Sequence, residues 1–142
     1  MHFPMSKVVS SENETADIAK QFSKILSAGE IVLLNGELGT GKTFFVKSAC
    51  SDYGIANVSS PSFSIVNEYH NSKKIIHFDF YRIKKVGELY DIGFEDYLNE
   101  SDSIIFIEWA NLFPEVLPKR NYQIDFKLLN NSSREIRIQK ND

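Results

Sequence analysis

The octapeptide GELGTGKT, residues 36–43, is the most informative stretch of this sequence. It matches the pattern G-x-x-x-x-G-K-[ST], a P-loop, in which backbone N–H groups point inward at phosphate oxygens. The run EIVLLN at 30–35 precedes the loop and predicts a buried strand, and a helix is expected over residues 42–52. A strand before the loop and a helix after it are the context that the pattern requires. We therefore expect a phosphate-binding site at the N-terminus of that helix.

The residue types in the loop indicate its ligands. Lys42 is expected to neutralise the β- and γ-phosphates, and the Thr43 hydroxyl is expected to ligate Mg²⁺. The expected cofactors are therefore ATP or ADP and Mg²⁺. The expected nucleotide contacts are the loop residues and the first residues of the helix, namely Glu37, Leu38, Gly39, Thr40, Gly41, Lys42, Thr43 and Phe44.

Two predicted strands end in a carboxylate that would complete a magnesium site. The apolar run IIFIE ends at Glu108 in the usual form of a Walker B element, and the run IIHFD ends at Asp79. Glu108 and Thr43 are the predicted metal ligands, and Lys42, Asp79 and Glu108 are the predicted catalytic residues. The sequence leaves open which of the two carboxylates orients the attacking water.

Two ring-bearing residues lie beside these carboxylates in the sequence. His77 shares a strand face with Asp79. We interpret it as a half-buried, hydrogen-bonded core residue. The alternatives are a metal ligand paired with Asp79 or a general base. Trp109 directly follows Glu108, so it is expected near the nucleotide if Glu108 is, and simple core packing is the alternative reading.

The composition predicts one soluble globular domain spanning residues 1–142. A net charge of −3 argues against a chain that holds nucleic acid by its own electrostatic field. The single cysteine, Cys50, excludes an internal disulfide and is interpreted as a small buried hydrophobe. Residues 1–10 carry no apolar run typical of a signal peptide, and no stretch approaches the ~20 apolar residues of a membrane span. We expect a cytoplasmic protein without membrane contact.

Alternating strands and helices predict the fold class. Ser11 and Glu14 form a capping box that starts a helix, which Gly29 is expected to stop. Further strands are predicted at 64–69, 74–81, 103–108, 122–129 and 134–139, the last two as a hairpin, with one or two short helices within 84–99. This order predicts a three-layer α/β fold of the P-loop NTPase type, with a mainly parallel sheet and antiparallel edge strands.

Together these segments resemble the bacterial TsaE/YjeE family, the ATPase component of tRNA threonylcarbamoyladenosine biosynthesis. The P-loop alone is shared by a vast superfamily, whereas S-P-[ST]-F followed by H-x-D-x-Y-R and E-W is far more specific. The similarity covers nearly the whole chain. It includes SENET at 11–15, GELGTGKTFFVK at 36–47, VSSPSFSIV at 58–66, HFDFYR at 77–82, Glu88, Gly93, IEW at 107–109 and REI at 134–136.

The resemblance implies roles for particular residues. Thr43 and Glu108 would bind Mg²⁺, and Asp79 would serve a catalytic or switch function. The Ser-Pro-Thr segment of the family acts as a switch near the γ-phosphate; here Ser62 stands in place of the threonine and keeps the hydroxyl.

Two further positions, Thr15 and Arg134, are similar to residues near the family's nucleotide pocket. The resemblance also implies a small ATPase, weak alone, that works with two partners: the threonylcarbamoyltransferase catalytic subunit and its non-catalytic paralogue (TsaD/TsaB-like). ATP binding and hydrolysis would reset the complex between turnovers, and tRNA would be contacted indirectly.

Two other readings remain open. A small-molecule kinase would need an acceptor pocket and, commonly, an arginine-bearing lid, whereas the arginines here are scattered at Arg82, Arg120, Arg134 and Arg137. A nucleotide-gated docking module would suit the acidic and aromatic segment 88–97, if that segment is exposed. A GTPase is disfavoured because the sequence has no Asn-Lys-x-Asp element.

Overall fold

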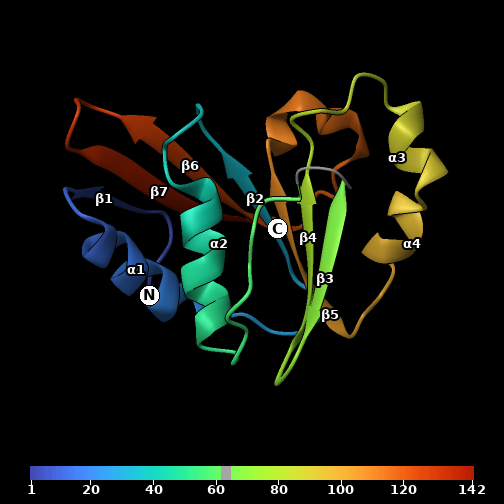
Figure 1. The fold of residues 1–142 in the computed structure, drawn as a ribbon, viewed down its shortest axis with the longest axis horizontal. Helices are drawn as coiled ribbons and strands as arrows, with labels where there is room; N and C mark the ends of the chain where they lie inside the picture. Colours follow the sequence, from blue (N-terminus) through green and yellow to red (C-terminus); the bar gives the residue numbers. More distant parts are fainter. Residues whose placement is uncertain (62–64) are drawn as a thin grey trace.

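Residues 1–61 and 65–142, the part of the chain that the computed structural model describes, form a seven-stranded sheet with helices on both faces (Figure 1). The strand order is β1-β7-β6-β2-β5-β4-β3, so β2 lies at the centre. The elements are β1 (Met5–Val9), α1 (Glu12–Ser23), β2 (Ile31–Asn35), α2 (Lys42–Ser51), β3 (Val66–His70), β4 (Lys74–Asp79), α3 (Gly87–Asp91), α4 (Phe94–Leu98), β5 (Ser103–Glu108), η1 (Ala110–Leu112), η2 (Pro114–Val116), β6 (Asn121–Leu128) and β7 (Arg134–Asn141).

Strand directions give a parallel centre and antiparallel edges. β2 pairs in parallel with both β5 and β6, and β4 pairs in parallel with β5. β7 runs antiparallel to β6, β1 antiparallel to β7, and β3 antiparallel to β4. The predicted α/β class, the antiparallel edges and the terminal hairpin are confirmed. The sheet is more mixed than expected because β1 forms an edge where the sequence predicts no strand.

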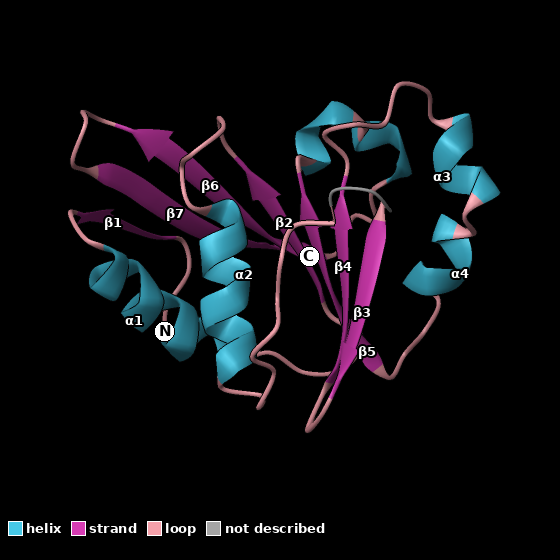
Figure 2. Ribbon diagram, viewed as in Figure 1, coloured by secondary structure: helices cyan, strands magenta, loops and turns pink. Residues whose placement is uncertain are grey.

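Apolar side chains fill the space on both faces of the sheet. On one face, Phe22 of α1 and Phe45 of α2 belong to a buried cluster that reaches β6 and β7. On the other face, Leu89 of α3 and Phe94 of α4 pack on β4, where the rings of Phe94 and Phe78 lie 5.0 Å apart, edge to face. The sheet therefore lies between two helical layers (Figure 2). In the described ranges, none of these helices is long and apolar enough to cross a membrane.

Helix α1 ends at Ser23, earlier than the predicted stop at Gly29. In a continuing helix the Ser23 carbonyl would accept the N–H of Ser27. Instead, this carbonyl accepts the hydroxyl of Tyr53 at 2.6 Å, and the N–H of Ser27 donates to the carboxylate of Glu30 at 2.6 Å. One distant contact, from Tyr53, and one local contact, to Glu30, thus replace the helical hydrogen bond, and the chain turns toward β2.

The strands also differ in places from the expectation. Strand β1 buries only Val9, so its sequence lacks the apolar alternation by which a strand is recognised. Strand β4 stops at Asp79, two residues before the predicted end, because the Asp79 carboxylate accepts the N–H of Tyr81 at 2.9 Å and turns the chain. Strand β3 begins at Val66, and the predicted start at Ser64 lies outside the described residues.

The carboxyl ends of the parallel strands meet at one edge of the sheet. Asn35 ends β2, Asp79 ends β4 and Glu108 ends β5, and the register places Asp79 directly opposite Glu108. Helix α2 begins at Lys42, at the end of the connection that leaves β2. In open α/β sheets this edge is where ligands bind. The fold therefore gathers the residues that the sequence singles out.

Candidate phosphate and magnesium site

The connection between β2 and α2, residues 36–41, is called the glycine loop below. Gly36, Gly39 and Gly41 have positive φ values of 155°, 77° and 102°. A Cβ on Gly36 would lie 2.8 Å from the carbonyl oxygen of Phe126, so only glycine fits between the loop and β6. Gly41 is the N-cap of α2 and has no side chain to cap the helix. The first N–H groups of α2 therefore remain available to a ligand.

Lys42 lies almost fully buried against the glycine loop, with 5% of its surface exposed. Its ammonium donates to the carbonyl oxygens of Gly36 at 2.5 Å and Glu37 at 2.9 Å, and it lies 4.3 Å from the centroid of the Trp109 ring. Burial lowers the pKa of Lys42, and nearby carboxylates, Glu108 foremost, oppose that shift. The loop thus holds a cation at the cavity wall.

Thr43 and Glu108 meet between α2 and β5. The Thr43 hydroxyl oxygen lies 2.9 Å from each carboxylate oxygen of Glu108. Glu108 is 3% exposed, and its Oε2 also lies 2.6 Å from Nε2 of the fully buried His77. A buried carboxylate needs such hydrogen bonds to offset the loss of water. The structure brings the two predicted metal ligands into contact and places His77 as a hydrogen-bonded core residue; metal binding stays a prediction.

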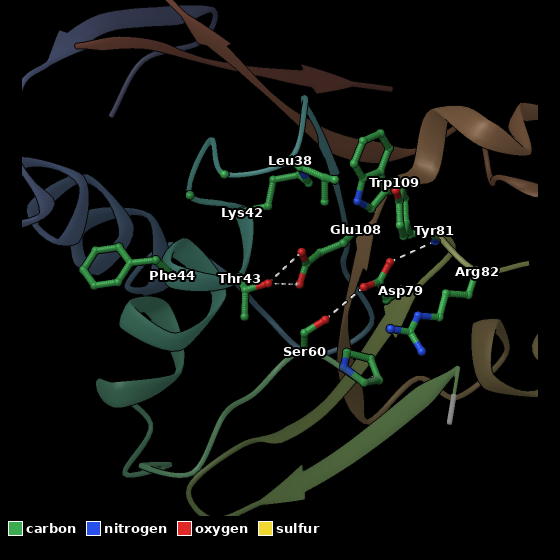
Figure 3. A pocket seen from close by; sticks show the side chains of 13 residues that line it. Leu38, Lys42, Thr43, Phe44, Ser60, Asp79, Tyr81, Arg82, Glu108 and Trp109 are labelled. Atoms are coloured by element: carbon green, nitrogen blue, oxygen red, sulfur yellow. Dashed lines mark hydrogen bonds between the residues drawn. The ribbon is translucent and has the colours of Figure 1, made fainter. Parts of the chain in front are cut away.

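Asp79 lies beside Glu108 at the end of the neighbouring strand. Its Oδ2 accepts the hydroxyl of Ser60 at 3.0 Å, and its Oδ1 accepts the N–H of Tyr81 at 2.9 Å. Ser60 belongs to the connection between α2 and β3, so a segment distant in sequence holds this carboxylate. Two carboxylates therefore face one space from neighbouring strands, each fixed by its own hydrogen bonds (Figure 3).

Trp109 adopts a left-handed backbone conformation, with φ 58°, the only non-glycine residue in the described ranges to do so. The backbone N–H of Trp109 donates to the carbonyl of Leu34 at 2.9 Å, which ties this residue to the end of β2. Its ring lies against that of Tyr81, with centroids 4.9 Å apart. Non-glycine residues in this region are uncommon, and such strain clusters at functional sites. Trp109 lines the cavity and lies in cation–π contact with Lys42.

A cavity of about 420 Å³ opens between the glycine loop, α2 and the ends of β4 and β5. Its volume lies within the usual range of small-molecule sites. Figure 3 shows the side chains of Thr43 and Glu108 pointing toward each other and that of Asp79 meeting Ser60, whereas the ring of Phe44 points away. The lining residues are Leu38, Gly39, Gly41, Lys42, Thr43, Phe44, Ser60, Pro61, Asp79, Tyr81, Arg82, Glu108 and Trp109.

Several residues expected at the nucleotide lie outside this lining. Thr15 is buried in the first turns of α1. Thr40 is buried, and its hydroxyl donates to the carbonyl of Glu37 at 2.8 Å. Arg134, at the start of β7, donates to the Thr40 carbonyl at 2.7 Å and so supports the glycine loop from β7. Ser62 lies outside the described residues.

Sequence reasoning did not single out Ser60, Tyr81 or Arg82 as site residues, although all three line the cavity. Arg82 in particular is one of the arginines that the sequence presents as scattered. Tyr81 and Arg82 come two and three residues after the end of β4, and residues just beyond a parallel strand lie at its carboxyl end, where ligands bind. Their position within HFDFYR is the signal that would have found them.

Known proteins are similar to this chain in sequence and in fold. The family model for the threonylcarbamoyl adenosine biosynthesis protein TsaE matches residues 9–136. The tRNA threonylcarbamoyladenosine biosynthesis protein TsaE of Rickettsia typhi is 39% identical over 137 residues, which cover 93% of this chain and 92% of that protein. Its namesake from Bacillus subtilis is 36% identical over 125 residues, covering 87% and 77%. The crystal structure of Bacillus subtilis YdiB matches with a TM-score of 0.83 and 28% identity, over 100% of this chain and 90% of that one.

Proposed function

The chain belongs to the TsaE family of threonylcarbamoyl adenosine biosynthesis proteins, and we propose that it is a magnesium-dependent ATPase with a P-loop NTPase-like fold. The family serves the threonylcarbamoyladenosine modification of tRNA. In this proposal the protein is an accessory factor, weak as an ATPase alone, whose ATP binding and hydrolysis reset the modifying complex between turnovers.

The contact between Thr43 and Glu108 is the observation that carries the proposal. In P-loop proteins, Mg²⁺ is held by the Ser or Thr of the loop and by a carboxylate at the end of a neighbouring strand. Here the Thr43 hydroxyl lies 2.9 Å from both Glu108 oxygens. Both groups offer hard oxygen atoms, the ligand class that Mg²⁺ prefers, so the residues fit the ion. Bound Mg²⁺ would supply charge neutralisation at the β- and γ-phosphates.

The glycine loop and Lys42 fit the triphosphate. The N-terminus of α2 offers free N–H groups and the positive end of the helix dipole to an anion. The Lys42 ammonium would exchange its contacts with the carbonyls of Gly36 and Glu37 for phosphate oxygens. Burial lowers the pKa of Lys42, and a phosphate bound beside it would oppose this shift by favouring the charged form of the ammonium.

We assign the orientation of the attacking water to Asp79. Both oxygens of Glu108 already contact Thr43, and one of them contacts His77, so Glu108 is committed to the metal side of the cavity. Asp79 faces the same cavity from β4, where Ser60 and the Tyr81 N–H fix its carboxylate. The chain's residues would then act by positioning and charge stabilisation.

The proposed partners are the threonylcarbamoyltransferase catalytic subunit and its non-catalytic paralogue, with tRNA contacted only through them. A net charge of −3 supports indirect contact, because proteins that hold nucleic acid themselves present clustered positive charge. The modification chemistry would then take place on the partner subunits, and this chain would supply the energy-coupled step.

The test is phosphate release from ATP by the protein together with the partner pair. Thr43→Val keeps the shape of the side chain but removes the hydroxyl, so Mg²⁺-dependent hydrolysis is expected to fall by about 100-fold or more, as for the loss of one preorganised group. Thr43→Ser keeps the hydroxyl and is the matched control, expected to retain activity. Equal hydrolysis by wild type and a folded Thr43→Val would refute the proposed magnesium site.

A further inference from the structure

We propose that His77 is a positioning residue that fixes the Glu108 carboxylate in the orientation needed to bind Mg²⁺, an inference that rests on the proposed function. His77 is fully buried in β4, and its Nε2 lies 2.6 Å from Oε2 of Glu108. Among the described side chains, the opposite ring nitrogen, Nδ1, is buried without a hydrogen-bond partner. The polar contact of this ring is therefore directed at one carboxylate oxygen.

Strand register explains how the ring reaches Glu108. His77 pairs with Phe106 on β5, and Glu108 lies two residues further along that strand, on the same face. Diagonal neighbours of this kind lie within reach of long or aromatic side chains. The neighbours of His77 on its own strand, Ile76 and Phe78, pack into the core on the opposite face. The imidazole thus lies on the α2 side of the sheet, where Thr43 also approaches.

The chemistry of the pair fixes the direction of the hydrogen bond. An ionised carboxylate can only accept, so Nε2 carries the proton and donates to Oε2. A second contact to Glu108 comes from Thr43, whose hydroxyl oxygen lies 2.9 Å from each of the two carboxylate oxygens. A single hydroxyl proton shared between two acceptors holds each of them more weakly than a hydrogen bond to one alone. Without His77, the carboxylate would be held by a hydroxyl that is itself a proposed metal ligand.

Outer groups that hydrogen-bond a metal-binding carboxylate typically contribute 10- to 100-fold in metal affinity or activity. Substitutions of His77 by other side chains at the same buried position can test whether it positions Glu108. Glutamine places its amide nitrogen near the position of Nε2, whereas asparagine places it near Nδ1, away from Glu108. Leucine removes the donor altogether. If His77 positions Glu108, His77→Gln retains metal binding and His77→Asn does not.

The experiment measures metal binding without turnover. ADP binding is followed by isothermal titration calorimetry at increasing Mg²⁺, and Mn²⁺ binding in the presence of ADP is followed by electron paramagnetic resonance. We expect His77→Leu and His77→Asn to raise the half-saturating metal concentration by about 10- to 100-fold. ADP affinity in EDTA is expected to stay at the wild-type value, and His77→Gln is expected to bind metal like wild type. Thermal unfolding of each variant reports on folding.

Wild-type metal binding by a folded His77→Leu or His77→Asn would overturn the positioning role and leave the proposed function intact. Equal impairment of the glutamine and asparagine variants would also overturn it, since that pattern indicates a packing role. If His77→Leu does not fold, the glutamine and asparagine pair decides. If the ADP affinity of the wild-type protein does not change with Mg²⁺ concentration, that result would instead refute the proposed function.

Discussion

Replacing Glu108 with glutamine separates the charge of this side chain from its shape. The change keeps the volume of the side chain but removes the negative charge from the proposed metal ligand. We expect Mg²⁺-dependent hydrolysis to fall about 100- to 1,000-fold, because losing one preorganised electrostatic group typically costs about 2.7–4 kcal/mol of transition-state stabilisation. The glycine loop and Lys42 are untouched, so nucleotide binding without Mg²⁺ is expected to persist.

The same change is expected to preserve or raise the stability of the fold. Glu108 is 3% exposed, and a neutral isostere removes the desolvation penalty of a buried charge. The amide oxygen can accept from His77 Nε2, while the amide nitrogen donates to the Thr43 oxygen, so both present contacts keep a partner. We expect a melting temperature no more than about 3 °C below that of wild type, the shift that roughly 1 kcal/mol produces in a domain of this size.

Phosphate release at saturating ATP and Mg²⁺, with the partner pair present, measures the first effect, and thermal unfolding measures the second. Glu108→Ala is the comparison that also removes the side-chain volume, so it is expected to lose stability as well as activity. Unchanged turnover by a folded Glu108→Gln would refute the assigned role and move it to Asp79. A strongly destabilised Glu108→Gln would contradict the expectation that the fold does not depend on the charge of this side chain.

Gly36→Ala is expected to lower the free energy of unfolding by about 2–6 kcal/mol, from about 1–3 for strain at positive φ and about 1–3 for crowding against Phe126. Gly39→Ala, with no atom within 4 Å of its Cβ, should lose only the strain part, and equal losses on chemical denaturation would contradict this. Trp109 emission is expected to change when ADP and Mg²⁺ bind, because the ring lines the cavity. A flat titration under binding shown by calorimetry would place ADP elsewhere. Burial raises the pKa of the Cys50 thiol to about 12, so between the ordinary value of 9.0 and that value only the unfolded chain loses the proton. The free energy of unfolding should therefore fall over that range more steeply than in Cys50→Ala, and parallel curves would contradict the shift.

The parts of the site that follow from local sequence could be predicted. The glycine loop needs only the spacing of its glycines and the helix that follows. Glu108 and Asp79 end apolar runs, and the carboxyl ends of parallel strands must meet at one edge of a sheet, so their proximity follows from the fold class. Trp109 lies at the cavity for the same reason, because it follows Glu108 in the chain, and its contact with a nucleotide stays a prediction.

Features that depend on distant partners could not be predicted. The end of α1 depends on Tyr53, which lies 30 residues further along the chain and takes the Ser23 carbonyl. Strand β1 exists because β7 offers it an antiparallel edge, and its own residues carry little apolar pattern. Arg134 supports the glycine loop through the Thr40 carbonyl, a contact between residues 94 positions apart. Such contacts leave no periodic signal in the sequence.

The segment 88–97 shows how burial divides a stretch that looks uniform. Leu89 and Phe94 are buried against β4, whereas Tyr90 remains 55% exposed. Only part of the aromatic surface that the sequence suggested for docking is therefore available. Helices α3 and α4 are five residues long each, too short for a helical pattern in the sequence to reveal this division.

Multiple-turnover formation of threonylcarbamoyladenosine in tRNA, by the protein together with the threonylcarbamoyltransferase pair, tests the proposed function most directly. Wild type and Lys42→Ala are compared with and without ATP. The proposed function requires that wild type with ATP sustains turnover and that Lys42→Ala does not, because Lys42 would hold the phosphates. Equal turnover by the two proteins would show that nucleotide binding at the glycine loop plays no part in the modification.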